Sequence, residues 1–353
     1  MNSLKTIFFI ALFALFIIGC GHDSLTEPLN FKAYQNNPVL SPGEPGSWDE
    51  LFVWTPQIVF HEDIYYLFYT GGNIGGRMAV GLATSDDGFN FTKYPGNPVL
   101  SPDNKGLDAF TVGPGIILRD KYNWVMYYNE QELASFAPGR FIGRATSVNL
   151  TGLWIKDEIP VISSGVLGEW DAGFIIPGSV LKLENGSYVM YYTAGKDLAL
   201  FDDFYVGMAT SPDGINWKKY NDAATSEHPF AASDPVMTTG KKGEWDCGFV
   251  WMPNVTKNND GYRMYYSASD VNDRKEFKSI GYATSHDGIH WKKYAHNPVY
   301  RSTQDPFALS GGITGYIENP ALLYLDTHCL MYYECGPFNI ESTYIAVAIG
   351  RQK

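Results

Sequence analysis

The sequence is poor in positive charge. It has 26 Lys and Arg residues against 38 Asp and Glu residues, which gives a formal net charge of −12. Nucleic acids and anionic membrane surfaces are recognised through basic patches, so this balance argues against both as partners. The composition therefore favours a neutral or cationic partner.

Cysteines are also few, and none stands at the spacing of a metal site. Three of the four follow Cys20, namely Cys247, Cys329 and Cys335. An odd number without ligand spacing predicts no disulfide framework, although one pair could form. No cofactor motif is visible either, so we expect no cofactor.

Long hydrophobic runs are confined to the N-terminus, and the run there is too short to cross a bilayer comfortably. It spans residues 6–18, follows Lys5 and is typical of a secretion signal. Gly19 and Cys20 directly after it resemble the lipobox of bacterial lipoproteins, in which the cysteine is lipidated after cleavage. The alternative is an ordinary signal peptide with an incidental cysteine.

The lipobox resemblance predicts a lipoprotein signal peptide over residues 1–19, Cys20 as the lipid anchor, and an anchor and linker over residues 20–30. The protein would then lie in the bacterial cell envelope, periplasmic or at the cell surface, and would touch the membrane through this anchor alone. We expect residues 31–353 to form a single domain and the protein to be a monomer.

The rest of the chain is one motif repeated five times. The phrase Asn-Pro-Val-Leu-Ser-Pro at Asn37 returns at Asn97, and variants follow at Pro160, Asp234 and Asn297. The period is about sixty residues, which suits four strands with generous loops. Each unit holds a proline-led apolar strand, a Tyr-Tyr strand, a Gly-x-Ala-Thr-Ser strand and a short fourth strand. No helical period of comparable length occurs after the N-terminal run.

The ends of the repeat predict how the units are arranged. The last unit stops after its third strand, whereas residues 31–34, before the first unit, match the fourth strands of the other units. If the N-terminal strand completes the last unit, the array closes into a ring and loses an exposed sheet edge. We therefore predict an all-β fold: a five-bladed β-propeller with four antiparallel strands per blade and the N-terminal strand closing the last blade.

Three turns between third and fourth strands read Ser-x-Asp-Gly, and they begin at Ser85, Ser211 and Ser285. Asp-Gly is typical of tight hairpins, because glycine adopts positive φ and the aspartate caps neighbouring amides. We interpret these turns as structural.

A polar residue that departs from the repeat is a candidate for function. One glutamate, Glu318, stands two residues before the proline of the last unit, where the other units have apolar residues. The residues at this place are Trp54, Val112, Ile175, Trp251 and Glu318.

Three further residues depart from the repeat. Glu334 follows the last Tyr-Tyr pair, where other units have a small polar residue, and Glu130 is displaced by one position in the second unit. Arg144 replaces an apolar residue in a third strand, and an arginine there could bind a carboxylate or sugar hydroxyls. For each of them the alternative is a local salt bridge or a solvent-facing exchange.

Aspartates in the loops before the proline-led strands form another group of candidates. Asp49, Asp171 and Asp246 follow a tryptophan, and Asp108 follows a leucine. Their repetition favours a structural role. However, a propeller brings equivalent loops together around one axis, so several carboxylates there would face a common pocket.

The repeated phrases Ser-x-Asp-Gly-x-x-Trp-x-Lys, Asn-Pro-Val-Leu, Trp-Asp-x-Gly-Phe and Met-Tyr-Tyr-Thr resemble those of the five-bladed propellers of the arabinanase, levansucrase and invertase superfamily. That superfamily includes glycoside hydrolase families 43, 32 and 130. The resemblance covers nearly the whole chain after the signal peptide. It is more specific for the fold than for the activity, because these phrases build blades.

The resemblance implies acidic residues at the starts of the innermost strands, around an axial pocket. Glu318-Asn319-Pro320 is the nearest match to that acid motif. The usual Asp-Pro of a catalytic base is missing, because Thr55, Gly113, Ile176 and Met252 precede the other prolines. A structural calcium ion on the axis is implied by the resemblance alone.

Cleavage of a glycosidic bond needs one carboxylic acid and a second carboxylate as base or nucleophile. We expect Glu318 to be the acid, with a pKa raised by burial, and Asp49 or Asp108 to be its partner. The carbohydrate would stack on aromatic rings and bond to polar side chains. The expected substrate-binding residues are Trp54, Trp251, Asp171, Asp246, Arg144, Glu130 and Glu334.

The predicted function is therefore a glycoside hydrolase acting on a poly- or oligosaccharide. One alternative is a noncatalytic carbohydrate-binding lipoprotein, which would not need a pair of acids. A glycoside phosphorylase would need a cationic cluster for phosphate, to which these exceptions contribute only Arg144. A propeller that serves as a protein-interaction platform is a further alternative.

Overall fold

The computed structural model describes residues 27–73, 77–103, 111–131, 141–196, 203–270, 278–309, 315–337 and 343–351. Over these ranges the fold is all-β, and its one helical element is the short 3₁₀ helix η3 (Ser302–Gln304). No helix in this part of the chain is long and apolar enough to cross a membrane. The predicted signal peptide and Cys20 lie outside the described residues.

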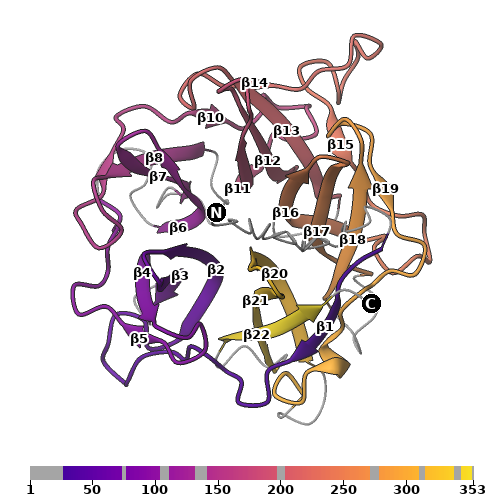
Figure 1. The fold of residues 1–353 in the computed structure, drawn as a ribbon. Helices are drawn as coiled ribbons and strands as arrows, with labels where there is room; N and C mark the ends of the chain where they lie inside the picture. Colours follow the sequence, from indigo (N-terminus) through magenta and orange to yellow (C-terminus); the bar gives the residue numbers. More distant parts are fainter. Residues whose placement is uncertain are drawn as a thin grey trace, which may run out of the picture.

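The described strands follow the sequence repeats as five antiparallel groups, here called units one to five, and Figure 1 shows them arranged around a centre. The first strand of each unit lies nearest the centre. Units one and two join into one sheet through a single parallel pair, Met78 opposite Thr111. The units are, in order, β2 (Phe52–His61), β3 (Ile64–Gly72), β4 (Met78–Ser85) and β5 (Thr92–Lys93); β6 (Thr111–Asp120), β7 (Asn123–Gln131), β8 (Phe141–Ser147), β9 (Ile155–Lys156) and β10 (Ile162–Ser163); β11 (Phe174–Lys182), β12 (Tyr188–Gly195), β13 (Tyr205–Ser211), β14 (Lys218–Lys219) and β15 (Pro235–Met237); β16 (Phe249–Asn258), β17 (Gly261–Ser269), β18 (Ser279–Ser285) and β19 (Lys292–Lys293); β20 (Gly315–Tyr324), β21 (Cys329–Pro337), β22 (Tyr344–Arg351) and β1 (Asn30–Ala33).

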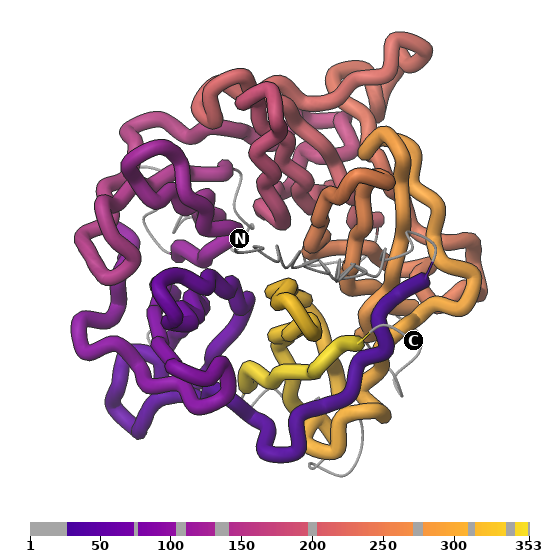
Figure 2. The backbone as a smooth tube through the Cα atoms, in the orientation of Figure 1, coloured from indigo at the N-terminus to yellow at the C-terminus, as the bar shows by residue number. Residues whose placement is uncertain are grey.

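The N-terminal strand completes the last unit, as the sequence predicted. β1 pairs antiparallel with β22, with Phe31 opposite Gly350. The buried ring of Phe31 makes edge contacts with Tyr265 and Tyr300, at centroid distances of 5.6 and 6.2 Å. Figure 2 shows the indigo β1 running beside the yellow end of the described chain. The first and last described strands therefore lie in one sheet.

The glycine of the Gly-x-Ala-Thr-Ser phrase is explained by a tyrosine that crosses it. A Cβ on Gly81 would lie 2.3 Å from the ring of Tyr69. Tyr69 follows Phe68 and takes the place of the second tyrosine of the Tyr-Tyr pairs in other units. Such a contact is far inside van der Waals distance, so only glycine fits below the ring. The same pairs recur in other units, as Tyr128 with Gly143, Tyr192 with Gly207, and Tyr266 with Gly281.

The first tyrosine of the Tyr-Tyr pair links one unit to the next. The Tyr332 hydroxyl of unit five donates to the carbonyl of Gly88, in the Ser-x-Asp-Gly turn of unit one, at 2.8 Å. The same bond joins units two and three and units three and four, as Tyr127 to Gly214 at 2.6 Å and Tyr191 to Gly288 at 2.9 Å. Gly88 has a φ of 79°, which agrees with the structural role predicted for these turns.

Candidate active site

Glu318 lies near the start of β20, directly opposite Glu334 on β21. Both side chains are buried, with exposed fractions of 3% and 4%. The strand register shifts just after Glu318, and Asn319 has a φ of 56°, which is unusual for a residue other than glycine. A β-bulge of this kind changes the direction of a side chain and is common beside active sites.

The bulge recurs in β2 and β16, where the residue before the proline also has a positive φ. Its backbone N–H donates to a side chain of the preceding unit, as Met252 does to Thr193 Oγ1 at 2.7 Å and Asn319 to Ser267 Oγ at 2.8 Å. In unit one the donor is Thr55, and its acceptor is Glu334 Oε2 at 3.3 Å. Glu334 therefore replaces a hydroxyl in the link between the last unit and the first.

Glu334 is surrounded by hydrogen-bonding groups. Its Oε2 also accepts from Asn319 Nδ2 at 2.7 Å, and its Oε1 lies 3.2 Å from the Tyr316 hydroxyl. Burial, followed by the nearby charge of Glu318, raises the pKa of Glu334 to about 8. The Tyr316 hydroxyl donates to Oε1, so three donors face this carboxyl group.

Lys278 is a residue of this site that the sequence analysis missed. Its buried ammonium lies 2.6 Å from Glu318 Oε1, and 4.9 and 5.4 Å from the ring centroids of Trp251 and Tyr316. The ammonium stabilises the negative charge of Glu318. Its backbone carbonyl accepts from Ile317 N at 3.4 Å, which places the lysine beside Glu318.

The repeat contained a signal for Lys278. The strand registers place it at the same position as Met78 in unit one, Phe204 in unit three and Thr343 in unit five. A charged residue there differs from these three units, but unit two has Arg140 three residues before its Gly143, so the repeat marks Lys278 less clearly than Glu318. Lys278 directly precedes the third strand of its unit, β18. It therefore lies outside the proline-led, Tyr-Tyr and Gly-x-Ala phrases that define the repeat.

Several buried polar atoms around Glu318 have no hydrogen-bond partner among the described residues. They are Glu318 Oε2, Asn319 Oδ1 and the indole nitrogens of Trp54 and Trp251. The two tryptophans hold the place of Glu318 in the units on either side, on strands that pack against β20. Native proteins seldom leave such groups unsatisfied, so their accumulation at the starts of three innermost strands indicates a place for a polar ligand.

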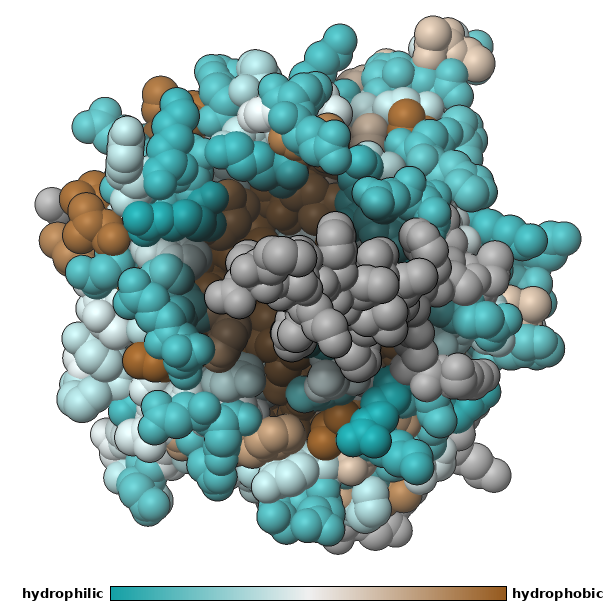
Figure 3. Space-filling model, viewed as in Figure 1, coloured by the Kyte–Doolittle hydropathy of each residue, from teal (hydrophilic) through white to brown (hydrophobic). Residues whose placement is uncertain are grey.

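The rings at this end of the strands are already ordered by other aromatic residues. Trp54 stacks on Phe52 with ring centroids 3.7 Å apart, and Trp251 packs against Phe204 and Phe249. Figure 3 shows hydrophobic side chains in a depression at the centre of the viewed face, with hydrophilic ones around it.

The aspartates of the Trp-Asp loops do not lie with Glu318. Asp49 Oδ2 forms an ion pair of 2.7 Å with Lys93 and accepts from the Tyr69 hydroxyl at 2.9 Å. Because Tyr69 crosses Gly81, these contacts lie over the third and fourth strands, away from the innermost strand. Asp171 and Asp246 are placed alike, each 2.5 Å from the matching lysine of its own unit, Lys219 and Lys293. Each of these aspartates neutralises a lysine of its own unit, and their role in a common pocket stays a prediction.

The remaining candidates lie elsewhere. Arg144 Nη1 is 2.7 Å from Asp157 Oδ2, within the second unit. Glu130 is buried, and its Oε1 lies over Gly143 of its own third strand, where a Cβ would be 2.1 Å away. Asp108 lies outside the described residues. In the part of the chain that is described, no three His, Cys, Asp or Glu side chains gather as metal ligands do.

No model of a known protein family matches the sequence. Over 253 residues the chain is 25% identical to the 1,2-beta-oligomannan phosphorylase of Thermoanaerobacter sp., which covers 69% of this chain and 73% of that protein. Over 263 residues it is 25% identical to an uncharacterized protein of Mycobacterium tuberculosis, which covers 72% of this chain and 80% of the other.

Solved structures share the fold. A glycosyl hydrolase from Bacteroides ovatus superposes with a TM-score of 0.70 at 23% identity, over 91% of this chain and 93% of that one. A structure from the family 130 mannoside phosphorylases, described as containing glycoside hydrolases that target β-1,2 mannosidic linkages in Candida mannan, gives 0.70 at 22% over the same shares. A thermostable family 43 glycoside hydrolase gives 0.59 at 17%, over 85% and 89%. The chain therefore has the fold of the propeller glycoside hydrolases.

Proposed function

We propose that this protein is a carbohydrate-active enzyme that hydrolyses a glycosidic bond of a poly- or oligosaccharide at the site around Glu318. The observation that carries the proposal is Glu318 Oε2, which is buried and without a partner among the described residues, on a strand that contacts the strands of Trp54 and Trp251. A sugar offers hydroxyls to such atoms and apolar ring faces to the indoles. The protein also has the fold of enzymes that act on glycosidic bonds.

The architecture behind the proposal is a five-bladed propeller in which each unit is one blade and β1 closes the ring. Two observations support it: the pairing of β1 with β22, and the central position of the first strand in each unit. In such a ring the starts of the innermost strands meet at one end of the axis. Glu318, Trp54 and Trp251 all stand at these starts.

We propose that Glu318 is the base or nucleophile, which is the opposite of the role that the sequence suggested. The contact with the Lys278 ammonium stabilises negative charge at this position and supports the assignment. The pKa of Glu334, raised to about 8, keeps that neighbour protonated near neutrality, so it suits the acid. Asp108, which lies outside the described residues, remains a candidate for the second carboxylate.

Phosphorolysis is the second candidate function. The similarity to an oligomannan phosphorylase favours it, and Lys278 places one cation beside Glu318. The two reactions differ in the acceptor of the glycosyl group, which is water in one and inorganic phosphate in the other. The substrates suggested by these relatives are β-1,2-linked mannosides.

The test is to incubate residues 21–353 with β-1,2-linked mannooligosaccharides, with plant and microbial polysaccharides, and with synthetic glycosides. Each reaction is run with and without inorganic phosphate, with Glu318→Gln as the inactive control. Sugar released without phosphate supports the hydrolase, and a sugar phosphate formed only with phosphate replaces it by a phosphorylase. Silence across the panel with retained carbohydrate binding would favour a noncatalytic lipoprotein.

We also propose that Cys20 anchors the protein in the cell envelope, as the lipobox resemblance implies. Replacing it, as Cys20→Ser, should move the protein from the membrane fraction to the soluble fraction of cells that express the full chain. An unchanged distribution would rule the anchor out.

A further inference from the structure

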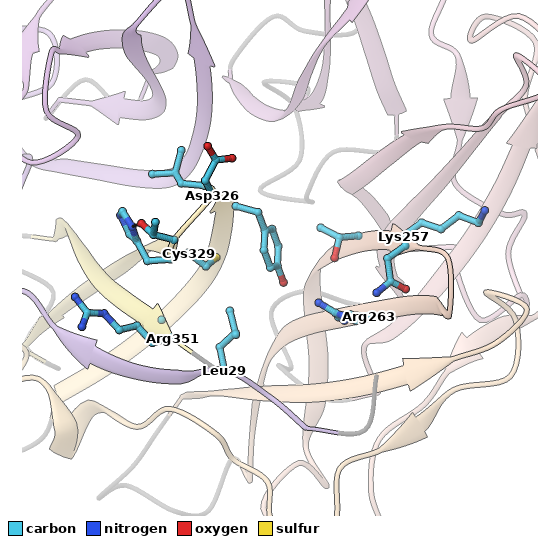
Figure 4. Close-up of a pocket in the computed structure, with 13 residues that line it drawn as sticks. Leu29, Lys257, Arg263, Asp326, Cys329 and Arg351 are labelled. Atoms are coloured by element: carbon cyan, nitrogen blue, oxygen red, sulfur yellow. Dashed lines mark hydrogen bonds between the residues drawn. The ribbon is translucent and has the colours of Figure 1, made fainter. Parts of the chain in front are cut away.

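A second cavity lies at the other end of β20, between the hairpin that joins β16 to β17 and the hairpin that joins β20 to β21. Its volume is about 690 Å³, within the range of small-molecule sites. Figure 4 shows Arg263 in the middle of the lining, with Lys257 on one side and Arg351 and Leu29 on the other. Thr256 and Tyr324 complete the part of the lining used below.

Arg263 departs from the repeat at this position. The strand registers align it with Tyr66, Val125, Val189 and Leu330 in the other units, all of them apolar or aromatic. The arginine is nevertheless buried, with an exposed fraction of 8%. A guanidinium cannot lose its charge in a protein, so burying it has an electrostatic cost that a leucine here would avoid.

The charge around the cavity has the opposite sign to that of the whole protein. The lining contains three cationic residues, Arg263, Lys257 and Arg351, and one acidic residue, Asp326. The chain as a whole carries a formal net charge of −12. The exposed Lys257 ammonium lies 5.7 Å from the ring centroid of Tyr262, which is not a lining residue, so the buried Arg263 is the cation on which the site depends. A concave site with low-dielectric walls concentrates such a field, so the cavity attracts anions from solution.

The cavity is remote from the candidate active site. Glu318 is the fourth residue of β20 and Tyr324 is its last, so about 20 Å of extended strand separates them. A ligand here cannot contact Glu318. The anion site itself does not depend on the function proposed above, whereas the choice of a sugar as its ligand rests on that function.

We propose that this cavity binds an acidic sugar through its carboxylate or phosphate group, with Arg263 as the main contact. A guanidinium presents paired N–H donors whose geometry matches two oxygens of either anion. The Thr256 hydroxyl, opposite Arg263 in the register, adds a neutral donor, and Tyr324 and Leu29 supply apolar surface for a sugar ring. Uronic acids and sugar phosphates share this chemistry.

The test is isothermal titration of the Glu318→Gln protein, in which the candidate active site is inactivated, with three probes. These are a uronic acid oligosaccharide, a hexose phosphate and a neutral oligosaccharide of the same length. Arg263→Leu supplies the residue that unit five has at this place, and thermal unfolding verifies that it folds. Arg119→Leu, which removes an exposed arginine in unit two, is the matched control.

We expect at least one acidic probe to bind, the binding to weaken at least tenfold in Arg263→Leu and with added salt, and Arg119→Leu to behave as the parent. Whichever acidic probe binds identifies the anion. Equal binding of the neutral probe, unchanged binding in Arg263→Leu, or no binding of either acidic probe would overturn the proposal.

Discussion

Glu318 and Glu334 face one another across β20 and β21, and the Lys278 ammonium lies on Glu318, 2.6 Å from its Oε1. The surroundings of these two buried carboxyl groups differ: a cation contacts Glu318, whereas burial raises the pKa of Glu334. Division of labour between two acids is what cleavage of a glycosidic bond requires. The predictions below test this inequality and the contacts that hold the site in place.

Replacing Glu318 by glutamine should abolish turnover and leave carbohydrate binding nearly intact. The amide keeps the size of the side chain but can act neither as a base nor as a nucleophile, so kcat should fall by at least about a thousandfold. The measurement is sugar release alongside a binding titration. A variant that retains its turnover would place the reaction elsewhere.

Asp49→Asn is the matched control for Glu318→Gln, because it also neutralises a buried carboxylate near the start of a proline-led strand. Its partners are Lys93 and Tyr69 in its own unit. We expect it to lower the melting temperature and to change kcat by no more than a few fold. A loss of turnover as large as that of Glu318→Gln, with unchanged stability, would restore Asp49 to the catalytic pair.

The stability of the protein should fall as the pH rises through the range in which Glu334 titrates. Folding raises the pKa of this group to about 8, so the folded state binds a proton that the unfolded state has already lost above the usual glutamate range. The free energy of unfolding then falls by at most about 1.4 kcal/mol per pH unit up to about pH 8, and this contribution levels off above it. Denaturant unfolding of the parent and of Glu334→Gln, compared at each pH, isolates the effect, since glutamine cannot titrate. Parallel curves would contradict the raised pKa.

Asp171→Asn should destabilise the fold. Asp171 is fully buried, and its Oδ2 lies 2.5 Å from the ammonium of Lys219, which would lose its counter-charge. Breaking such a pair by removing one partner leaves a poorly compensated charge, at a cost of about 2–4 kcal/mol. Chemical denaturation measures it. If Asp171 instead served as a substrate-binding group, the main change would be in KM, at unchanged stability.

Tyr332→Phe should weaken the junction between the last unit and the first. It removes the hydroxyl that donates to Gly88, and it leaves that buried carbonyl without its partner, at a cost of about 1 kcal/mol. The change is tolerable, because unit one has Phe68 at the equivalent place. Tyr122→Phe, on an exposed ring, is the control and should have no effect on thermal unfolding. Equal melting temperatures for both variants would show that the bond contributes nothing.

The sequence repeats were sufficient to predict which residues form strands and that Phe31 would lie in the last unit. These properties depend on the local alternation of apolar and polar residues and on turn residues, and both recur in each unit. The surroundings of the acids were not predictable in this way. Lys278 meets Glu318 from 40 residues away, and Asp49 meets Lys93 from 44 residues away. Such pairs are set by long-range packing, so the sequence alone did not show that the repeated aspartates contact lysines.

The antiparallel pairing of Asn30 with Arg351 means that the two chain ends lie where the other units have the turn between third and fourth strands. The order of the units around the fold is fixed by their packing. The position at which the chain begins and ends is not fixed in this way, so it can be moved to another surface turn. A circular permutant that joins Arg351 to Asn30 by a short turn, and is cut within the turn after Ser85, should form the same fold. Its N-terminus would then emerge one unit further around. The N-terminus connects the fold to any anchor that precedes it. The unit at which the chain begins therefore decides which side of the fold lies nearest that anchor.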